Sequence, residues 1–221
     1  MNRRILARYI DHTLLKAEAT PAQITTLCEE ALENHFAAVC INALYVPLAV
    51  PLCRGSDVAV CTVIGFQLGA TSTAVKVCEA EIAMAQGATE IDTVIPVGLL
   101  IAQNRDRVYA DIAALASVCH SQGAILKVIL ETALLTDEEK VLACEICKQA
   151  KADFVKTSTG FAKGGATAAD IALMRKTVGP EMGIKAAGGI RNYETALEMI
   201  EAGATRIGAS SSLEIMKGAP A

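Results

Sequence analysis

The sequence contains no tryptophan, and aromatic residues make up only 4% of its 221 residues. Hydrophobic residues nevertheless reach 52%, so the core must consist mainly of alanine, valine, isoleucine and leucine, which typically fill parallel strands covered on both faces. No apolar run approaches the roughly 18 residues of a membrane-spanning helix. No apolar segment follows the arginines of residues 1–10, as a secretory signal would require. These absences predict an unexported, cytoplasmic protein without a membrane partner.

The sequence also lacks a basic cluster and the residue spacings of common metal sites. Its formal net charge is −4, and the lysines and arginines are scattered, which argues against a nucleic-acid partner. The histidines show no ligand spacing, and the one C-x-x-C pair, Cys144 and Cys147, has no second pair to complete a zinc site. The eight cysteines are spread over the chain, which favours a reducing compartment. We therefore predict no metal site.

Short β-branched segments alternate with longer amphipathic segments along the whole chain. The predicted strands are 9–13, 38–42, 58–65, 90–95, 126–131, 154–158, 184–188 and 206–209. Helices lie between them, and two begin with a capping box, at Thr20 and at Thr136. Eight strand–helix units without a linker predict a single α/β domain over residues 1–221, a (β/α)8 TIM barrel. We prefer the barrel to an open doubly wound sheet because polar residues come late in most strands.

A weak internal repeat places three different residues at the same depth. The segments 87–92, 151–156 and 203–208 each close a helix, turn the chain and enter a strand. They end on Asp92, Lys156 and Gly208, which should therefore occupy equivalent positions in three strands.

A lysine within an apolar strand segment requires an explanation, because burying an unpaired ammonium costs several kcal/mol. An ion pair, or a strand end that reaches solvent, would explain one such lysine. Lys156 and Lys185, however, lie on consecutive strands of an array that also carries Asp92 and Lys127. Like charges at short range disfavour protonation, so Lys185 would leave Lys156 as a neutral amine that attacks carbonyls. With Asp92 as a proton shuttle, the pattern predicts a Schiff-base-forming aldolase.

Glycine-rich segments follow the last three predicted strands, at 157–165, 186–189 and 208–212. Loops after strands seven and eight of a barrel commonly form a phosphate site, although each glycine pair alone is equally typical of a tight turn. The expected substrate is therefore a phosphate ester. Cys40 falls late in its strand, where it either lines the mouth of the barrel or is a small core thiol.

Six segments together resemble deoxyribose-phosphate aldolase, namely 10–16, 38–42, 90–92, 126–132, 154–161 and 184–191. The resemblance extends from about Ile10 to Ser212, nearly the whole chain. Its most specific part is the run V-K-T-S-T-G-F, which begins at Val155, followed by K-A-A-G-G-I-R, which begins at Lys185.

The resemblance implies reversible cleavage of 2-deoxy-D-ribose 5-phosphate to D-glyceraldehyde 3-phosphate and acetaldehyde, without a metal or an organic cofactor. It implies that Lys156 forms the imine, that Lys185 promotes the neutral amine and that Asp92 transfers protons. A family tendency toward dimers, together with the alanine-rich helices, favours a homodimer. The resemblance, the polar residues late in the strands and the glycine-rich segments together predict the substrate-binding residues. These are Asp11, Lys127, Cys40, Thr159, Gly160, Gly188, Gly189, Gly208, Ser210 and Ser211.

Two features depart from the family pattern. The segment 93–98 reads T-V-I-P-V-G where the family usually has M-V-I-N-I-G, so that Pro96, which lacks an N–H, reshapes the loop. The last residue, Ala221, is not the tyrosine that some members use in proton transfer. Both departures concern turnover and substrate preference rather than the type of reaction. Two other functions remain open, a transaldolase-type Schiff-base aldolase of another sugar phosphate and a non-catalytic phosphate-binding barrel.

Overall fold

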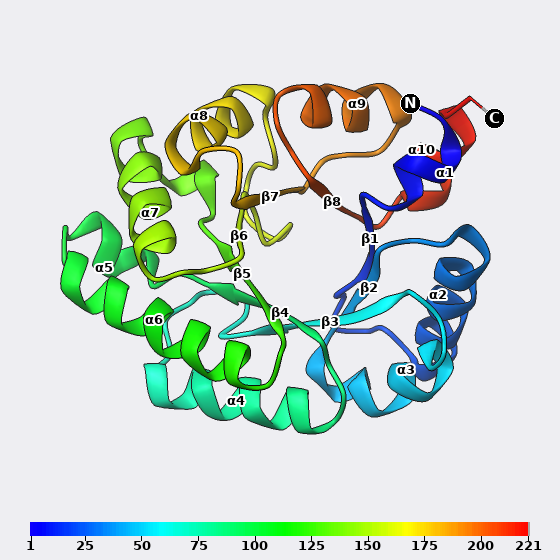
Figure 1. Cartoon of the computed structure of the whole chain (residues 1–221), viewed down its shortest axis with the longest axis horizontal. Coiled ribbons are helices and arrows are strands. Elements are labelled where there is room, and N and C mark those ends of the chain that lie inside the picture. The colour runs from blue at the N-terminus through cyan, green and yellow to red at the C-terminus, as the bar shows by residue number, and fades with distance from the viewer. Residues whose placement is uncertain (221) are drawn as a thin grey trace.

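A computed structural model, which describes residues 1–220, shows a closed barrel of parallel strands surrounded by helices (Figure 1). Each strand pairs with the next, and the last strand pairs with the first. The predicted (β/α)8 barrel is thus confirmed, and the open sheet is excluded because neither terminal strand is an edge. Ala221, where the sequence lacks a terminal tyrosine, lies outside the described residues. The strands are β1 (Ile10–Leu14), β2 (Ala38–Ile41), β3 (Ala59–Ile64), β4 (Glu90–Val94), β5 (Ile125–Ile129), β6 (Phe154–Lys156), β7 (Gly183–Ala187) and β8 (Arg206–Ala209).

The helices begin where the sequence signals place them. Both predicted capping boxes are present, at Thr20 with Gln23 and at Thr136 with Glu139. Pro96 precedes a short helix, and its carbonyl accepts hydrogen bonds from the backbone N–H groups one turn later. The α-helices are α1 (Arg3–Ala7), α2 (Pro21–Asn34), α3 (Val46–Cys53), α4 (Thr73–Ala85), α5 (Val97–Ile101), α6 (Arg105–Ser121), α7 (Asp137–Gln149), α8 (Ala168–Val178), α9 (Tyr193–Glu201) and α10 (Ser212–Gly218), with 3-10 turns η1 (Ala43–Tyr45) and η2 (Thr132–Leu134).

Two strands end two residues earlier than the sequence predicts. Strand β5 stops at Ile129 because Glu131 adopts a left-handed conformation, with φ 56°. Strand β6 stops at Lys156 because the side chain of Thr157 replaces part of the ladder. Its Oγ1 donates to the carbonyl of Ala187 and accepts from the N–H of the same residue, both at 3.0 Å.

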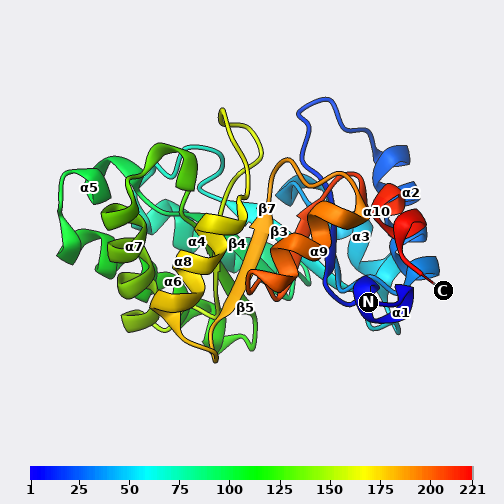
Figure 2. The same cartoon turned by 90° about the horizontal axis from the view of Figure 1, so that it is seen from above.

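The loops after β1 and β6 rise from the same end of the barrel, the blue and yellow loops at the top of Figure 2. This end carries the carboxyl ends of the strands, where the active sites of such barrels lie. Within residues 1–220, none of the helices has the length and apolar character needed to span a membrane.

The main hydrophobic core lies between the strands and the surrounding helices, and it consists largely of valine, isoleucine, leucine and alanine. A second, smaller cluster contains Leu15, Ala38, Cys40, Cys61 and Val63. Its members come from β2, β3 and the residue that follows β1, and Cys61 contacts charged side chains of β4 and β5. Part of the barrel interior is therefore apolar, and the part next to β4–β8 is charged.

A buried ion pair outside the barrel connects α4, α6 and the end of β4. The Nζ of Lys76 lies 2.7 Å from Asp111 Oδ2 and donates to the carbonyl of Val94 at 2.9 Å. Thr73 Oγ1 donates to the other Asp111 oxygen at 2.7 Å. The side chains of Lys76 and Asp111 are 0% and 3% exposed, so neither charge is compensated by solvent.

Replacing Asp111 by alanine is expected to destabilise the protein by about 3–5 kcal/mol, because it leaves the ammonium of Lys76 buried without its counterion. The double variant Lys76→Met/Asp111→Leu should recover most of the loss, since it removes both charges. Urea unfolding of the two variants and the wild type measures the difference. Equal losses in the single and double variants would show that packing volume, not the unpaired charge, is responsible.

Candidate active site

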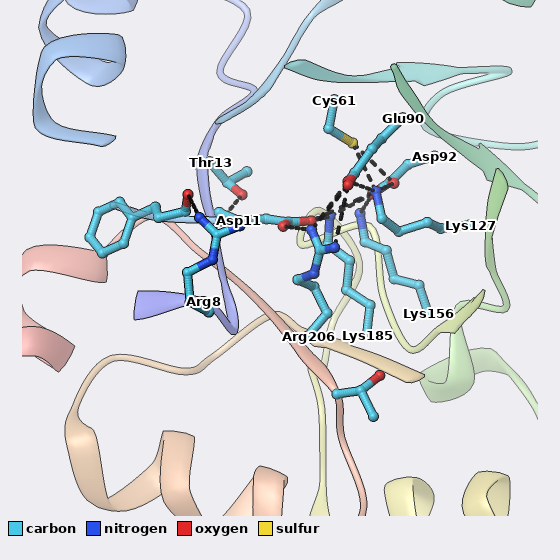
Figure 3. A network of polar contacts seen from close by, with 12 residues as sticks. Arg8, Asp11, Thr13, Cys61, Glu90, Asp92, Lys127, Lys156, Lys185 and Arg206 are labelled. Carbon is cyan, nitrogen blue, oxygen red and sulfur yellow. Dashed lines mark hydrogen bonds and ion pairs between the residues drawn. The ribbon is translucent and has the colours of Figure 1, made fainter. Parts of the chain in front are cut away.

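The carboxylate of Asp92, on β4, is the centre of the charged part of the barrel (Figure 3). Its Oδ2 accepts hydrogen bonds from Lys156 Nζ at 2.7 Å and from Lys185 Nζ at 2.8 Å. Its Oδ1 accepts from Lys127 Nζ at 2.9 Å and from Cys61 Sγ at 3.1 Å. The structure thus brings the predicted Asp92, Lys156 and Lys185 together, and both lysines share one carboxylate oxygen.

The strand register explains this convergence. Lys156 is paired directly with Lys185 across β6 and β7, and Asp92 with Lys127 across β4 and β5. Gly208 lies next to Lys185, where a Cβ would stand 2.9 Å from Lys185 Cε. Only a glycine at position 208 therefore allows the side chain of Lys185 to stay where it is. The third member of the internal repeat provides space rather than a functional group.

Three further charged residues surround this centre. Lys127 Nζ lies 2.6 Å from Glu90 Oε2, and Lys185 Nζ lies 2.5 Å from Asp11 Oδ2 in an ion pair that lacks hydrogen-bond alignment. Arg206 Nη1 lies 2.6 Å from Asp11 Oδ1 and 3.2 Å from Glu90 Oε2, and its guanidinium covers the Phe154 ring at 5.5 Å. Neither Glu90 nor Arg206 was predicted from the sequence as a site residue.

The ion pairs determine the charge of the buried groups. Burial opposes ionisation of Asp92, but Lys127, Lys156 and Lys185 outweigh it and hold its pKa well below its usual range. Burial likewise opposes the charged form of Lys185, yet Asp11 and Asp92 raise its pKa above the usual value. At neutral pH, Asp92 is therefore a carboxylate and Lys185 an ammonium.

A cavity of about 350 Å³ opens at the carboxyl ends of β1, β6, β7 and β8. Many of its lining residues were predicted, namely Lys156, Thr159, Gly160, Gly188, Gly189, Gly208 and Ser210. Lys16 and Arg191 also line it and were not selected from the sequence. Both lie within segments that resemble the aldolase family. Their positions directly after β1 and β7 were the feature of the sequence that could have identified them as site residues.

Other predicted site residues lie elsewhere. Asp11, Asp92, Lys127 and Lys185 are buried and do not line the cavity, so that Lys156 stands between them and the open space. Cys40 is buried in the small apolar cluster. A hydrogen bond to Cys61 and the charge of Lys185 favour its thiolate, whereas burial opposes it. The hydrogen bond to Cys61 is the largest of these effects, and the pKa of Cys40 falls to about 7.

Glu131 holds the loop that follows β6. Its left-handed backbone turns the carboxylate toward Thr159, whose N–H donates to the two carboxylate oxygens at 3.3 and 3.2 Å. The hydroxyl of Thr159 also donates to Glu131. Because Thr159 lines the cavity, Glu131 positions one wall of the site.

Two sets of side chains lie close enough to hold a metal ion, Cys40 with Cys61 and Asp92, and Asp11 with Cys61 and Glu90. Lys127 already contacts members of both sets, since its Nζ lies 2.9 Å from Asp92, 2.6 Å from Glu90 and 3.2 Å from Cys61. A metal ion would therefore compete with an ammonium that already uses these atoms.

The chain is similar to known aldolases over nearly its whole length. Residues 5–218 match the model of the DeoC/LacD family aldolases. A deoxyribose-phosphate aldolase from Lysinibacillus sphaericus is 60% identical over 212 residues, which are 96% of this chain and 95% of that protein. A Coccidioides immitis structure assigned to the same enzyme has a TM-score of 0.94 at 42% identity, covering 98% of this chain and 86% of that one.

A third similar protein is the deoxyribose phosphate aldolase from Aeropyrum pernix, whose solved structure is described as a unique tetramer. Its TM-score is 0.92 at 34% identity, and the match covers 97% of this chain and 91% of that one. The match of the family model over nearly the whole chain, together with the identity to these relatives, confirms the resemblance found in the sequence. The chain belongs to the DeoC/LacD family of aldolases.

Proposed function

We propose that this protein is a class I, Schiff-base-forming aldolase that reversibly cleaves 2-deoxy-D-ribose 5-phosphate to D-glyceraldehyde 3-phosphate and acetaldehyde. One observation carries the proposal: Lys156, on β6, lines the cavity and has its Nζ 2.7 Å from the buried carboxylate of Asp92. An amine in such a position can reach a carbonyl in the cavity while a charged group beneath it directs its protons.

The chemistry follows from the reaction of an amine with an aldehyde. The neutral amine of Lys156 adds to C1 of the open-chain sugar, and the carbinolamine loses water to form an imine. Because acetaldehyde contains two carbon atoms, the bond that breaks joins C2 and C3. Its electron pair moves into the imine to form an enamine, the C3 hydroxyl loses its proton, and D-glyceraldehyde 3-phosphate leaves. Protonation at C2 and hydrolysis then release acetaldehyde and restore the amine.

Asp92 and Lys185 direct the protons in this proposal. The Oδ2 atom of Asp92 contacts both Lys156 and Lys185, so a proton can pass between the two amines and a water molecule at the reacting carbon. The ammonium of Lys185 also favours the neutral form of Lys156, because like charges at short range repel.

The phosphate binds, in this proposal, where the loops after β1, β7 and β8 meet. Lys16 and Arg191 contribute cations to the cavity wall. Gly188 and Gly189 have φ values of 87° and 80°, a conformation that favours glycine and lets backbone N–H groups approach an anion. Ser210 adds a hydroxyl. The other predicted substrate contacts remain proposals: Thr159, Gly160 and Gly208, which line the cavity, Ser211, and the buried Asp11, Cys40 and Lys127, which do not line it.

Replacing Arg191 by methionine is expected to raise KM for the phosphorylated sugar about 10- to 100-fold, because a hydrogen bond between charged groups contributes about 1.5–3 kcal/mol. The smaller rate with unphosphorylated 2-deoxyribose should not change. Steady-state kinetics with both sugars measures the effect, with Arg54→Met as the control, since Arg54 lies near the starts of β3 and β4. Equal losses with both sugars would contradict a phosphate contact.

Borohydride trapping tests the proposed reaction. The protein is incubated with 2-deoxyribose 5-phosphate and sodium borohydride, and the modified peptide is located by mass spectrometry. We expect a reduced adduct on Lys156. An unmodified Lys156 in protein that binds the sugar phosphate would instead support a binding barrel, and trapping only with ketose phosphates would support a transaldolase-type enzyme.

We further propose that residues 1–221 work as one domain in a cytoplasmic homodimer. The eight cysteines are free thiols, which fits a reducing compartment. The tetramer of the Aeropyrum pernix relative is the alternative assembly. Light scattering on the purified protein distinguishes the two by mass.

A further inference from the structure

Seven ionisable side chains form one connected network inside the barrel, and their charges do not cancel (Figure 3). Its three carboxylates are Asp11, Glu90 and Asp92, and its four cationic groups are Lys127, Lys156, Lys185 and Arg206. With every group ionised, the network carries one excess positive charge.

Solvent does little to screen this excess. Six of the seven side chains are at most 5% exposed, and Arg206 is 13% exposed. An uncompensated charge in such surroundings is costly, and a buried group commonly loses its charge instead. Release of one proton from the network would leave three positive and three negative charges.

Lys156 is the member that can release this proton. Arg206 keeps its proton in proteins. Lys127 has counterions in Glu90 and Asp92, at 2.6 and 2.9 Å, and Lys185 has Asp11 and Asp92, at 2.5 and 2.8 Å. Among the groups of residues 1–220, Lys156 is ion-paired only to Asp92, and it alone of the seven lines the cavity.

We propose that Glu90 and Arg206 are positioning residues that set, through the charge balance of this network, the pH at which Lys156 becomes a neutral amine. Neither residue lines the cavity, so both act through Lys127, Asp11 and Asp92 rather than on the substrate. The inference rests on the proposed Schiff-base function and adds to it that the neutral amine depends on the total charge, not on Lys185 alone.

Among the other titratable groups around Lys156 in the described residues, Cys40 is the one that can change this balance. Cys61, on β3, donates to Asp92, and burial, a contact with Cys40 and the charge of Asp92 raise its pKa, so it remains a thiol. A hydrogen bond to Cys61 and the charge of Lys185 lower the pKa of Cys40, on β2, to about 7. Its thiolate would offset the excess charge, so Cys40 requires a control. The carboxylate of Glu131, after β5, accepts a hydrogen bond from the N–H of Thr159. Lys16 and Arg191, at the rim, are exposed to solvent.

Two substitutions with opposite effects on the charge test the inference. Glu90→Gln raises the excess to two positive charges, so the acidic limb of the pH profile of kcat/KM should move down by about one pH unit. Arg206→Gln removes the excess positive charge, so Lys156 keeps its proton to a higher pH. The acidic limb should therefore move up by about one pH unit. The double variant restores the original excess, and its limb should return to that of the wild type.

Three controls separate charge from structure. Arg206→Lys keeps the charge and should leave the limb in place, even if kcat falls. Lys140→Gln removes a charge between α7 and α8, outside the barrel, and should not move the limb. The Glu90 and Arg206 variants in a Cys40→Ala background should show the same directions of shift. If Arg206→Gln does not fold by circular dichroism, Glu90→Gln and the double variant still decide the question.

Limbs that stay in place, or that move in the same direction in both single variants, would overturn the inference. Borohydride trapping on the same proteins keeps this result apart from the proposed function. An imine on Lys156 together with an unmoved limb contradicts only the charge balance. Absence of the imine in the wild type contradicts the aldolase assignment itself.

Discussion

Replacement of Lys156 by methionine is expected to lower kcat by about four orders of magnitude or more, because removal of a covalent nucleophile abolishes the intermediate on which every later step depends. The variant should still fold. Its loss of one cation leaves Lys127, Lys185 and Arg206 facing three carboxylates, so the buried network becomes balanced. Coupled assay of glyceraldehyde 3-phosphate release measures the rate, and urea unfolding measures the stability.

Lys148→Met is the matched control for this variant. It makes the same chemical change at an exposed position near the start of β6, away from the cavity, and should retain the wild-type rate. A Lys156→Met protein with more than about 1% of the wild-type kcat would mean that another amine forms the imine. Lys185 would then be the first residue to examine, because its Nζ shares an Asp92 oxygen with that of Lys156.

Local sequence signals predicted the strands and helices well. Alternating apolar segments placed every strand within two residues at each end, and the capping boxes at Thr20 and Thr136 marked two helix starts. The errors occurred where a side chain or a turn ended a strand. The hydroxyl of Thr157 bonds to the backbone of β7, and Glu131 adopts a left-handed conformation, and neither event leaves a periodic signal in the sequence.

The central residues of the site could be predicted because charges within apolar strands are conspicuous. Lys156, Lys185 and Asp92 stand out for this reason. Their sharing of one carboxylate oxygen could not be predicted, because it depends on how the strands close into a barrel. Arg206 was overlooked since it is the first residue of β8, a position where a charge commonly reaches solvent. Here it turns inward to Asp11 and Glu90.

The position of Cys40 shows a different limit. The sequence allowed either a mouth-lining residue or a core thiol, because both occur late in a strand. In the structure, it packs with Leu15, Ala38 and Val63. This cluster exists because β2, β3 and the residue after β1 direct small and apolar side chains inward, whereas β4–β8, together with Asp11 of β1, direct charged ones. That asymmetry depends on strands far apart in the sequence.

Replacement of Asp92 by asparagine is expected to lower kcat by about two to four orders of magnitude, because the variant loses the group that transfers protons between Lys156, Lys185 and the substrate. The same change should lower stability by about 3–5 kcal/mol at neutral pH. With every group ionised, four cations then face only two carboxylates in a network that solvent barely reaches. Asp106→Asn, at an exposed position in the first turn of α6, is the control and should change stability by less than about 0.5 kcal/mol.

The pH dependence of stability gives this prediction a specific sign. The pKa of Asp92 is lower in the folded protein than its ordinary value of 3.8, so its ionic contribution is fully present above about pH 4 and is lost as the pH falls through the folded value. The difference in unfolding free energy between the wild type and Asp92→Asn should therefore be largest above pH 4 and shrink in acid. A difference that stayed constant down to about pH 2 would show that the asparagine disturbs packing, and that the buried carboxylate does not hold the lysines by its charge.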